Sequence, residues 1–198
     1  ASYLHSFADV LEEKIEEFSD LEAEDTGMLR SLCFDGHLPR TIEHFRFYAE
    51  EAKRMEGRSV PLNSQYINLV HRVPVGVVGI VTPWNGPLSV SSLNIAAALA
   101  SGNTCIIKPS EQAPISVSLF GQIAEAIGLP KGVLNIIQGP GKPTGKALIN
   151  HPGVDSICFI GGTEVGKEVI KSSADHMKRV TLESVSYTHL TLPTTPYV

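Results

Sequence analysis

Residues 75–111 read VGVVGIVTPWNGPLSVSSLNIAAALASGNTCIIKPSE. A β-branched run at 75–81 is followed by an alanine-rich segment that starts near Pro87 and closes on Gly102, and a second β-branched run occupies 104–107. Short apolar runs that alternate with helical segments are typical of a parallel sheet, because the crossover helices cover its faces. A glycine is also common where a helix ends. This stretch therefore predicts a strand–helix–strand unit.

The same alternation continues after this unit. It predicts three more strands, at 133–137, 156–160 and 179–182, and three more helices, which begin near Ile115, Pro143 and Thr163. Parallel strands in one sheet are joined by right-handed crossovers. The fold class expected is therefore α/β, a Rossmann-like parallel sheet with helices on both faces.

Two helices and one antiparallel strand are expected before the sheet. The first helix is predicted by apolar residues at steps of three or four, namely Leu4, Phe7, Leu11, Ile15 and Phe18. The second follows Pro39, with Ile42, Phe45, Ala49 and Ala52 on one face and with His44 and Tyr48 expected to be structural. Residues 66–73 alternate well enough for an antiparallel strand.

Residues 184–198 differ from the rest of the chain. They are rich in Ser, Thr and Pro and contain no charged residue. We interpret them as a foreign tail and residues 1–183 as the folded domain; a genuine disordered terminus is the alternative. Tyr187 and His189 are given no functional role.

The composition excludes several function classes. The chain has 198 residues, 42% of them hydrophobic, and a formal net charge of −5. This balance excludes a disordered polyelectrolyte, and without a basic stripe we expect no nucleic-acid partner. No run of roughly 18 apolar residues predicts a membrane span. The odd number of cysteines (Cys33, Cys105 and Cys158) predicts reduced thiols and a cytoplasmic protein; a targeting segment lost upstream stays open.

In an open parallel sheet, ligands bind beyond the carboxyl ends of the strands. Polar or glycine-rich segments follow all five predicted strands, at 83–87, 108–111, 139–145 and 161–166 and at Glu183. We expect these segments to meet at one edge of the sheet and to form a ligand site.

Two of the segments are glycine-rich turns. Backbone N–H groups at a glycine-rich helix start bind anions, and the helix dipole adds partial positive charge. The turn Gly161–Gly166 is the predicted pyrophosphate site. The turn with Gly139, Gly141 and Gly145 departs from the usual dinucleotide spacing, because Thr144 stands where the third glycine would be.

Lys108 and Glu111 follow one strand and are three residues apart, so both are candidates to contact a ribose. A carboxylate accepts a hydrogen bond from the 2′-hydroxyl and repels a 2′-phosphate, which favours NAD over NADP. The alternative is a surface ion pair of little energetic weight.

Asn85 and Glu183 are the candidate catalytic residues. The Asn85 amide is suited to donate to a developing oxyanion, and its alternative is a turn residue between two prolines. Glu183 is a candidate general base with a raised pKa in a dry site, and its alternative is an exposed strand end. Cys105 and Cys158 are expected to be inert core thiols, Cys33 lies in a predicted loop or helix end, and no Cys/His spacing suits a metal.

Four segments together resemble successive motifs of the NAD(P)-dependent aldehyde dehydrogenase superfamily. They are Val81-Thr82-Pro83-Trp84-Asn85, Lys108-Pro109-Ser110-Glu111, Phe159-Ile160-Gly161-Gly162-Thr163-Glu164-Val165-Gly166 and Val180-Thr181-Leu182-Glu183. They occur in the family's order over nearly all of residues 1–183. One difference is Gly162, where members of the family commonly have serine.

The resemblance implies a role for each matching position. Val81, Thr82, Pro83, Trp84 and Phe159 would line the cofactor site, and Asn85 would supply the oxyanion-hole amide. Lys108 and Glu111 would hold the adenosine ribose, and Gly141 and Gly145 would flank the adenine. Gly161, Gly162, Thr163, Val165 and Gly166 would carry the pyrophosphate, and Glu183 would activate water. The substrate would be a small-molecule aldehyde, and the full-length protein would be a homodimer or homotetramer with residues 66–73 in its intersubunit β-arm.

The departures from the family pattern are also informative. After the glutamate the family usually continues Leu-Gly-Gly-Lys, whereas this chain has Ser184-Val185-Ser186. The nucleophilic cysteine of the family belongs to a catalytic domain that is missing here, so we expect an N-terminal fragment without turnover of its own. Residues 25–49 resemble members that act on semialdehydes from aromatic breakdown, such as hydroxymuconic semialdehydes.

Two other functions stay open at this point. An acyl-phosphate reductase of related fold is disfavoured by Glu183, because such enzymes avoid attack by water. A non-catalytic NAD-binding or structural module derived from the same family is the alternative from a different class.

Overall fold

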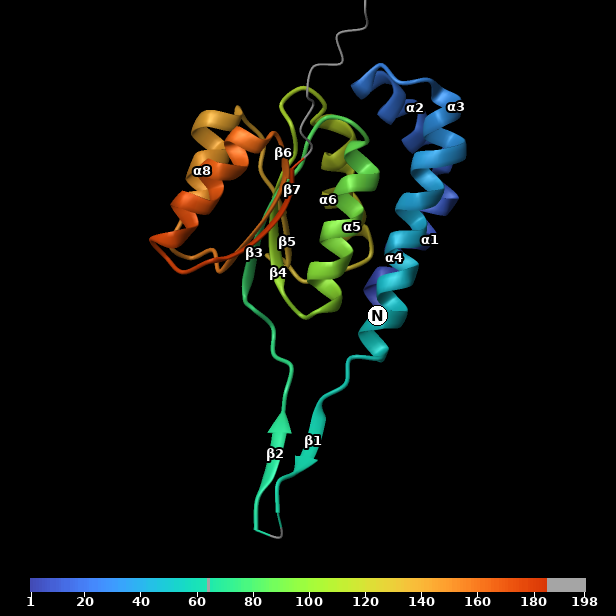
Figure 1. Ribbon diagram of the computed structural model, residues 1–198. Helices are drawn as coiled ribbons and strands as arrows, with labels where there is room; N and C mark the ends of the chain where they lie inside the picture. The colour runs from blue at the N-terminus through green and yellow to red at the C-terminus, as the bar shows by residue number, and fades with distance from the viewer. Residues whose placement is uncertain (64, 185–198) are drawn as a thin grey trace, which may run out of the picture.

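The computed structural model describes residues 1–63 and 65–184 (Figure 1). The N-terminal part is helical and comprises α1 (Ser2–Glu13), α2 (Ile15–Thr26), α3 (Arg30–Leu32), the π-helical turn η1 (Cys33–His37) and α4 (Leu38–Lys53). A hairpin of β1 (Arg58–Pro61) and β2 (Ile67–Val70) follows.

The rest of the described chain alternates strands and helices. The strands are β3 (Val77–Val81), β4 (Thr104–Lys108), β5 (Leu134–Ile136), β6 (Ser156–Gly161) and β7 (Arg179–Ser184). The helices are α5 (Pro87–Ala100), α6 (Ile115–Ala126), α7 (Lys146–Asn150), which continues from the π-helical turn η2 (Gly141–Gly145), and α8 (Thr163–Ala174).

The five strands form one parallel sheet in the order β5-β4-β3-β6-β7. Figure 1 shows α5 and α6 on one side of this sheet and α8 on the other. The predicted fold class is therefore confirmed, and each strand lies within two residues of its predicted bounds.

Successive side chains of a strand point to opposite faces of the sheet, so the sheet separates two cores. Ile80, Cys105 and Ile107 belong to the larger core, which α5 and α6 complete together with the N-terminal helices. Ile157 and Phe159 belong to a smaller core beneath α7 and α8. Burial on both faces explains why these strands are almost continuously apolar in sequence.

The N-terminal helices form an extra layer over α5 and α6. The single helix predicted from the first apolar pattern is two helices in the structure, because the backbone leaves helical geometry at Lys14. The layer is anchored by three buried rings: Phe7 stacks on Phe45 with ring centroids 4.8 Å apart, and both meet Phe120 of α6 edge-on. His44 Nδ1 lies 2.9 Å from Ser92 Oγ, which joins α4 to α5 in the structural role expected.

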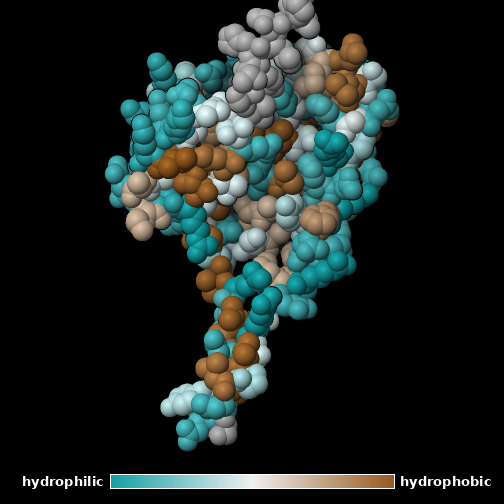
Figure 2. Space-filling view, viewed as in Figure 1, coloured by the Kyte–Doolittle hydropathy of each residue, from teal (hydrophilic) through white to brown (hydrophobic). Residues whose placement is uncertain are grey.

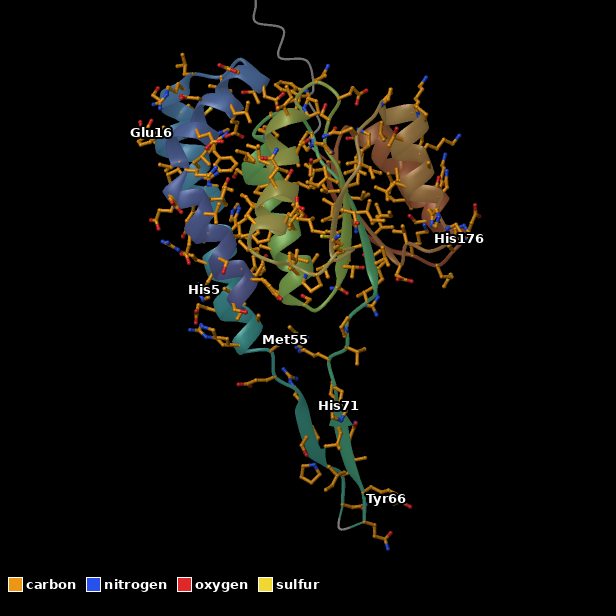
Figure 3. All side chains as sticks on the ribbon, turned by 180° about the vertical axis from the view of Figure 1, so that it is seen from behind. His5, Glu16, Met55, Tyr66, His71 and His176 are labelled. Atoms are coloured by element: carbon orange, nitrogen blue, oxygen red, sulfur yellow. The ribbon has the colours of Figure 1, made fainter. Side chains whose placement is uncertain are left out.

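The hairpin extends away from the body of the domain as an arm (Figure 1). Its strands pair antiparallel, which confirms the predicted antiparallel strand, and every residue of both is exposed. Figure 2 shows apolar side chains along its surface, and among these Val60, Leu62, Ile67 and Leu69 are exposed. Tyr66 and His71 lie on the arm, away from the sheet (Figure 3).

The last described strand ends at Ser184, which pairs with Gly161. The strand therefore runs one residue past the predicted domain limit at residue 183. Residues 185–198, with the predicted tail and its Tyr187 and His189, lie outside the described residues. No helix within the described part of the chain has both the length and the apolar character needed to cross a membrane.

The aromatic cluster predicts that two phenylalanines of α4, Phe45 and Phe47, contribute very differently to the free energy of unfolding. Phe45→Ala should lower the free energy of unfolding by roughly 3–5 kcal/mol, because it removes a fully buried ring that contacts two others. Phe47→Ala, at an exposed position of the same helix, is the control and should change stability by less than about 0.5 kcal/mol. Urea unfolding measures both, and equal losses would contradict the assignment of the core.

Candidate functional site

The strand register brings the predicted site segments to one edge of the sheet. Val81, at the end of β3, pairs with Lys108 of β4 on one side and with Phe159 of β6 on the other. Two residues further along β6, Gly161 pairs with Ser184 of β7. The chain passes from β3 to β4 on one side and from β6 to β7 on the other, which makes the β3/β6 boundary a topological switch point. Ligands of open α/β sheets bind in the crevice at such a point.

Lys108 and Glu111 form a compact polar group at this edge. Lys108 is 2% exposed, its Nζ donates to the Pro109 carbonyl at 2.6 Å, and the same Nζ lies 3.5 Å from Glu111 Oε2. Glu111 itself is exposed, and its Oε1 accepts a hydrogen bond from the Gly141 N–H at 3.2 Å. The N–H groups of Glu111 and Gly141, followed by the Lys108 charge, hold the pKa of the Glu111 carboxyl below its usual value.

The turn η2 lies directly against this group. A Cβ on Gly145 would be 3.5 Å from Lys108 Cδ, so the start of α7 packs on the lysine stem. Gly139 enters the turn with φ +142°, a conformation that L side chains rarely adopt, and a Cβ there would lie 2.2 Å from Thr144 Oγ1. The predicted residues Lys108, Glu111, Gly141 and Gly145 are therefore neighbours.

The N-terminus of α8 follows β6 at the same edge. Gly162 is its N-cap residue, in extended conformation, and makes no side-chain cap. A Cβ on Gly162 would meet no atom within 4 Å, so the space before the helix is open. Uncapped N–H groups with an aligned helix dipole form an anion site, which fits a diphosphate.

The segment after β3 is partly fixed and partly exposed. The Thr82 N–H donates to the Lys108 carbonyl at 3.2 Å, and its buried hydroxyl lies 3.2 Å from Ser91 Oγ. Trp84 and Asn85 are exposed, so both side chains are available to a ligand. Gly86 then turns with φ +84° into α5.

One expectation about a reactive group needs correction. Glu183 lies near the end of β7 beside Ile160, but it is exposed, so the described residues do not provide the dry site expected around it. Cys33 lies at a helix end, as one of its two expected placements had it: it follows α3 directly, as the first residue of η1, and it is buried.

The other two cysteines behave as expected. Burial raises the thiol pKa of Cys105 to about 12 and that of Cys158 to about 11, so neither is a thiolate near neutral pH. Cys158 is only partly buried, and its Sγ lies 2.8 Å from Asn94 Oδ1.

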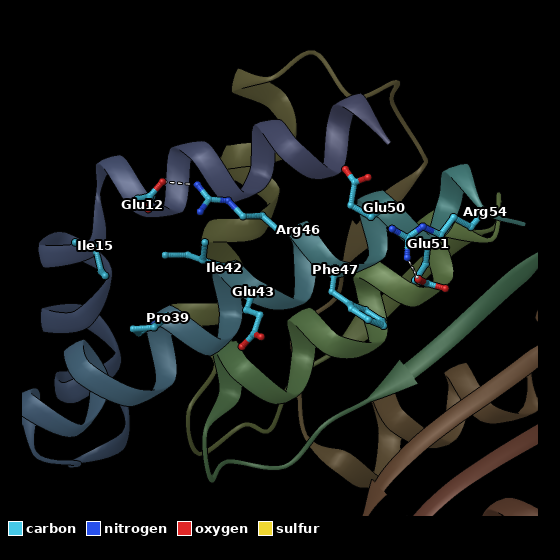
Figure 4. A pocket seen from close by; sticks show the side chains of 10 residues that line it. All are labelled: Glu12, Ile15, Pro39, Ile42, Glu43, Arg46, Phe47, Glu50, Glu51 and Arg54. Carbon is cyan, nitrogen blue, oxygen red and sulfur yellow. Dashed lines mark hydrogen bonds and ion pairs between the residues drawn. The ribbon is translucent and has the colours of Figure 1, made fainter.

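A groove of about 670 Å³ lies elsewhere, on the surface of α1 and α4 (Figure 4). Four of its charged side chains form ion pairs within the groove, Arg46 with Glu12 and Arg54 with Glu51. None of the predicted site residues lines this groove.

One buried acid near the site was missed in the sequence. Glu22 of α2 is fully buried, and its Oε1 accepts a hydrogen bond from the Leu88 N–H at the start of α5. A signal was present, because Glu22 lies four residues after Phe18 and so on the apolar face of its helix.

Comparison with known proteins agrees with this geometry. The model of the aldehyde dehydrogenase family matches residues 1–190. The chain belongs to the aldehyde dehydrogenase family. The resemblance seen in the sequence motifs is thus confirmed.

Several relatives are similar over most of the chain. The cytosolic 10-formyltetrahydrofolate dehydrogenase of Mus musculus is 40% identical over 185 residues, which cover 91% of this chain and 20% of that protein. The aldehyde dehydrogenase family 2 member C4 of Arabidopsis thaliana is 36% identical, with 92% of this chain and 37% of that protein covered. The NAD⁺ complex of an aldehyde dehydrogenase from Bacillus cereus superposes with a TM-score of 0.90 at 38% identity, over 92% of this chain and 37% of that one. The chain thus spans well under half the length of these relatives.

Substitutions at the adjacent glycines Gly161 and Gly162 test how the turn between β6 and α8 is placed. A Cβ on Gly161 would lie 2.7 Å from Phe159 Cζ, and Phe159 is buried. Gly161→Ala should therefore lower the free energy of unfolding by roughly 1–3 kcal/mol, as overpacking does. Gly162→Ser should raise it by a few tenths of a kcal/mol, about the difference between serine and glycine at an N-cap. Thermal unfolding compares the two variants, and equal effects would mean that the turn is placed wrongly.

Proposed function

We propose that this chain forms the NAD-binding part of an enzyme that oxidises an aldehyde to a carboxylic acid. The observation that carries the proposal is the grouping of Lys108, Glu111 and Gly141 beside the switch point of the sheet, together with the open N-terminus of α8. Family membership and the NAD⁺ complex of the Bacillus cereus relative support it.

Lys108 and Glu111 would hold the adenosine ribose. The Lys108 ammonium is a donor, and the ionised Glu111 carboxylate is an acceptor, which matches the two kinds of hydrogen bond that ribose hydroxyls make. The lowered pKa keeps Glu111 charged at neutral pH, and a charged carboxylate repels a 2′-phosphate. NAD is therefore the proposed cofactor and NADP is disfavoured.

The other parts of the dinucleotide would be held by neighbouring segments. Gly141 and Gly145 would flank the adenine, and the segment Gly161–Gly166 would bind the diphosphate with its backbone N–H groups. Val81, Thr82, Pro83, Trp84 and Phe159 would line the remainder of the cofactor site.

Two residues would act on the substrate. Asn85 would donate its side-chain N–H to the oxygen of the aldehyde as negative charge develops there. Glu183 would accept a proton from the water that releases the carboxylic acid. NAD, when bound, supplies the hydride acceptor.

The nucleophile would come from outside this chain. Cys33 and Cys105 are buried and Cys158 has a raised pKa, so none is suited to attack an aldehyde. The whole protein would be a homodimer or homotetramer of the cytoplasm, with the β1–β2 arm at an interface between subunits. Its substrate would be a small-molecule aldehyde.

A second candidate is a non-catalytic NAD-binding module derived from the same family. The exposure of Glu183 and the protonated cysteines favour it for this chain by itself. The two candidates share the cofactor site and differ in turnover.

The ribose assignment predicts a specific change in cofactor choice. Glu111→Ala should weaken NAD binding by roughly 1–3 kcal/mol, because it removes a charged acceptor. Glu111→Gln keeps an acceptor for the Gly141 N–H but loses the charge, so it should narrow the preference for NAD over NADP. Calorimetric titration with both dinucleotides measures these effects, and Glu125→Ala on the exposed side of α6 is the control. Unchanged affinities would show that Glu111 does not contact the ribose.

Turnover separates the two candidates. The 198-residue chain, mixed with NAD and a panel of aldehydes, should form no NADH above the background rate, because its own thiols are protonated. Absorbance at the NADH band measures this, with a complete aldehyde dehydrogenase as the positive control. NADH formation that a Cys158→Ser variant abolishes would contradict the assignment of the nucleophile to another region.

A further inference from the structure

Helices α5 and α6 both begin at the carboxyl edge of the sheet, and neither supplies its own cap. The N-cap residue is Gly86 for α5 and Pro114 for α6, and neither makes a side-chain cap. Glycine and proline have no side-chain acceptor, so the first free N–H groups of both helices need an acceptor from elsewhere. Figure 1 shows α2 at this same end of the domain.

Glu22 of α2 supplies the acceptor for α5. Its Oε1 accepts from the Leu88 N–H at 3.1 Å, the first N–H of the helix, since Pro87 has none. Burial raises the pKa of the Glu22 carboxyl to about 7, and the Leu88 N–H partly offsets this rise. Burying a carboxyl group costs free energy unless it is hydrogen-bonded. Glu22 is fully buried, and its hydrogen bond with the Leu88 N–H offsets part of this cost.

Asp25 supplies the acceptor for α6. Its Oδ2 accepts from the Ser116 N–H at 2.8 Å, again at the second residue of the helix. Glu22 and Asp25 are three residues apart on α2, so they lie on the same face of that helix. One helix thus caps two others, and we call this pair of acids the α2 clamp.

Each half of the clamp is adjacent to one segment of the proposed site. On the α5 side, the Asn85-Gly86 segment directly precedes the capped helix. Gly86 lies against the ring of His37: a Cβ on Gly86 would be 3.2 Å from His37 Cε1, and His37 Nδ1 is 3.7 Å from Glu22 Oε1. The His37 ring and the Glu22 carboxyl therefore hold the segment from two directions.

On the α6 side, a tight turn joins Glu111 to the capped helix. The Ala113 N–H donates to the Ser110 carbonyl at 3.3 Å, and the Gln112 N–H donates to Ser110 Oγ at 3.2 Å. Glu111 therefore lies between β4 and a helix start that Asp25 holds in place.

We propose that Glu22 and Asp25 are positioning residues of the aldehyde dehydrogenase site, Glu22 for Asn85 through α5 and Asp25 for Glu111 through α6. The assignment of what they position rests on the proposed function. The contacts themselves do not depend on it, because they join α2 to the two helix starts in the chain as it stands.

The Glu22 half is tested with Glu22→Met and Glu22→Gln in the 198-residue chain. Methionine fills a similar volume without an acceptor, so amide hydrogen exchange at Leu88 should become about five- to tenfold faster, as expected for a lost cap. Emission from Trp84, the only tryptophan, should shift because it precedes Asn85. Exchange at Ser116 should stay unchanged. Glutamine retains an acceptor and should restore slow exchange at Leu88.

The Asp25 half is tested with Asp25→Ala and Asp25→Asn. Alanine should speed exchange at Ser116 about five- to tenfold and raise the Kd for NAD by a similar factor, whereas Leu88 exchange and Trp84 emission stay unchanged. Asparagine keeps an acceptor and should restore both values. Glu24→Gln, at an exposed position of the same helix, is the control and should alter none of these readouts.

The outcomes distinguish the local loss of a helix cap from destabilisation of the whole domain, and they test the clamp independently of NAD binding. If amide exchange became equally faster at Leu88 and Ser116 in either Glu22→Met or Asp25→Ala, the clamp would be overturned. It would also be overturned if neither variant made exchange faster at either residue. If Glu22→Met does not fold, the Asp25 variants decide the proposal alone. If the wild-type chain binds no NAD, the proposed function is wrong, and the exchange pattern and Trp84 emission still decide the clamp.

Discussion

The parallel register of β3 with its two neighbours is the constraint on which the site depends. Because Val81 pairs with Lys108 on one side and with Phe159 on the other, the loops after β3 and β4 start level with each other at the carboxyl edge of the sheet, and the loop after β6 starts two residues further along. Each of those strands is buried on both faces, so a slip by one residue would move a whole set of apolar side chains from one core to the other. The packing of both cores therefore fixes the relative positions of the site loops.

Most of the sheet was predictable because its signals are local. The β-branched runs and the helix starts at Pro87, Ile115 and Thr163 follow from short-range sequence preferences, and the structure places them close to the expected positions. The break at Lys14 was not predictable from apolar spacing, since the apolar pattern continues across it. The cap made by Glu22 depends on a residue 66 positions away, so local patterns do not contain it.

For the polar residues of the site, the position along the sheet was predictable and the degree of burial was not. Their presence at one edge followed from the rule for parallel sheets, but burial depends on the packing of other segments. Lys108 is buried because Gly145 lets the start of α7 approach its stem, and the carbonyl of Pro109 and the carboxylate of Glu111 compensate its charge. Glu183 is exposed because it lies near the end of β7, which has a paired neighbour only on its β6 side among the described strands. Sequence spacing alone does not distinguish these two environments.

The β1–β2 arm has a consequence for how proteins with this architecture diverge. It leaves the domain after α4 and returns just before β3, and its strands pair only with each other among the described residues. The two cores contain no residue of either strand. Selection can therefore change the length and surface chemistry of the arm while the sheet and its two cores are inherited unaltered.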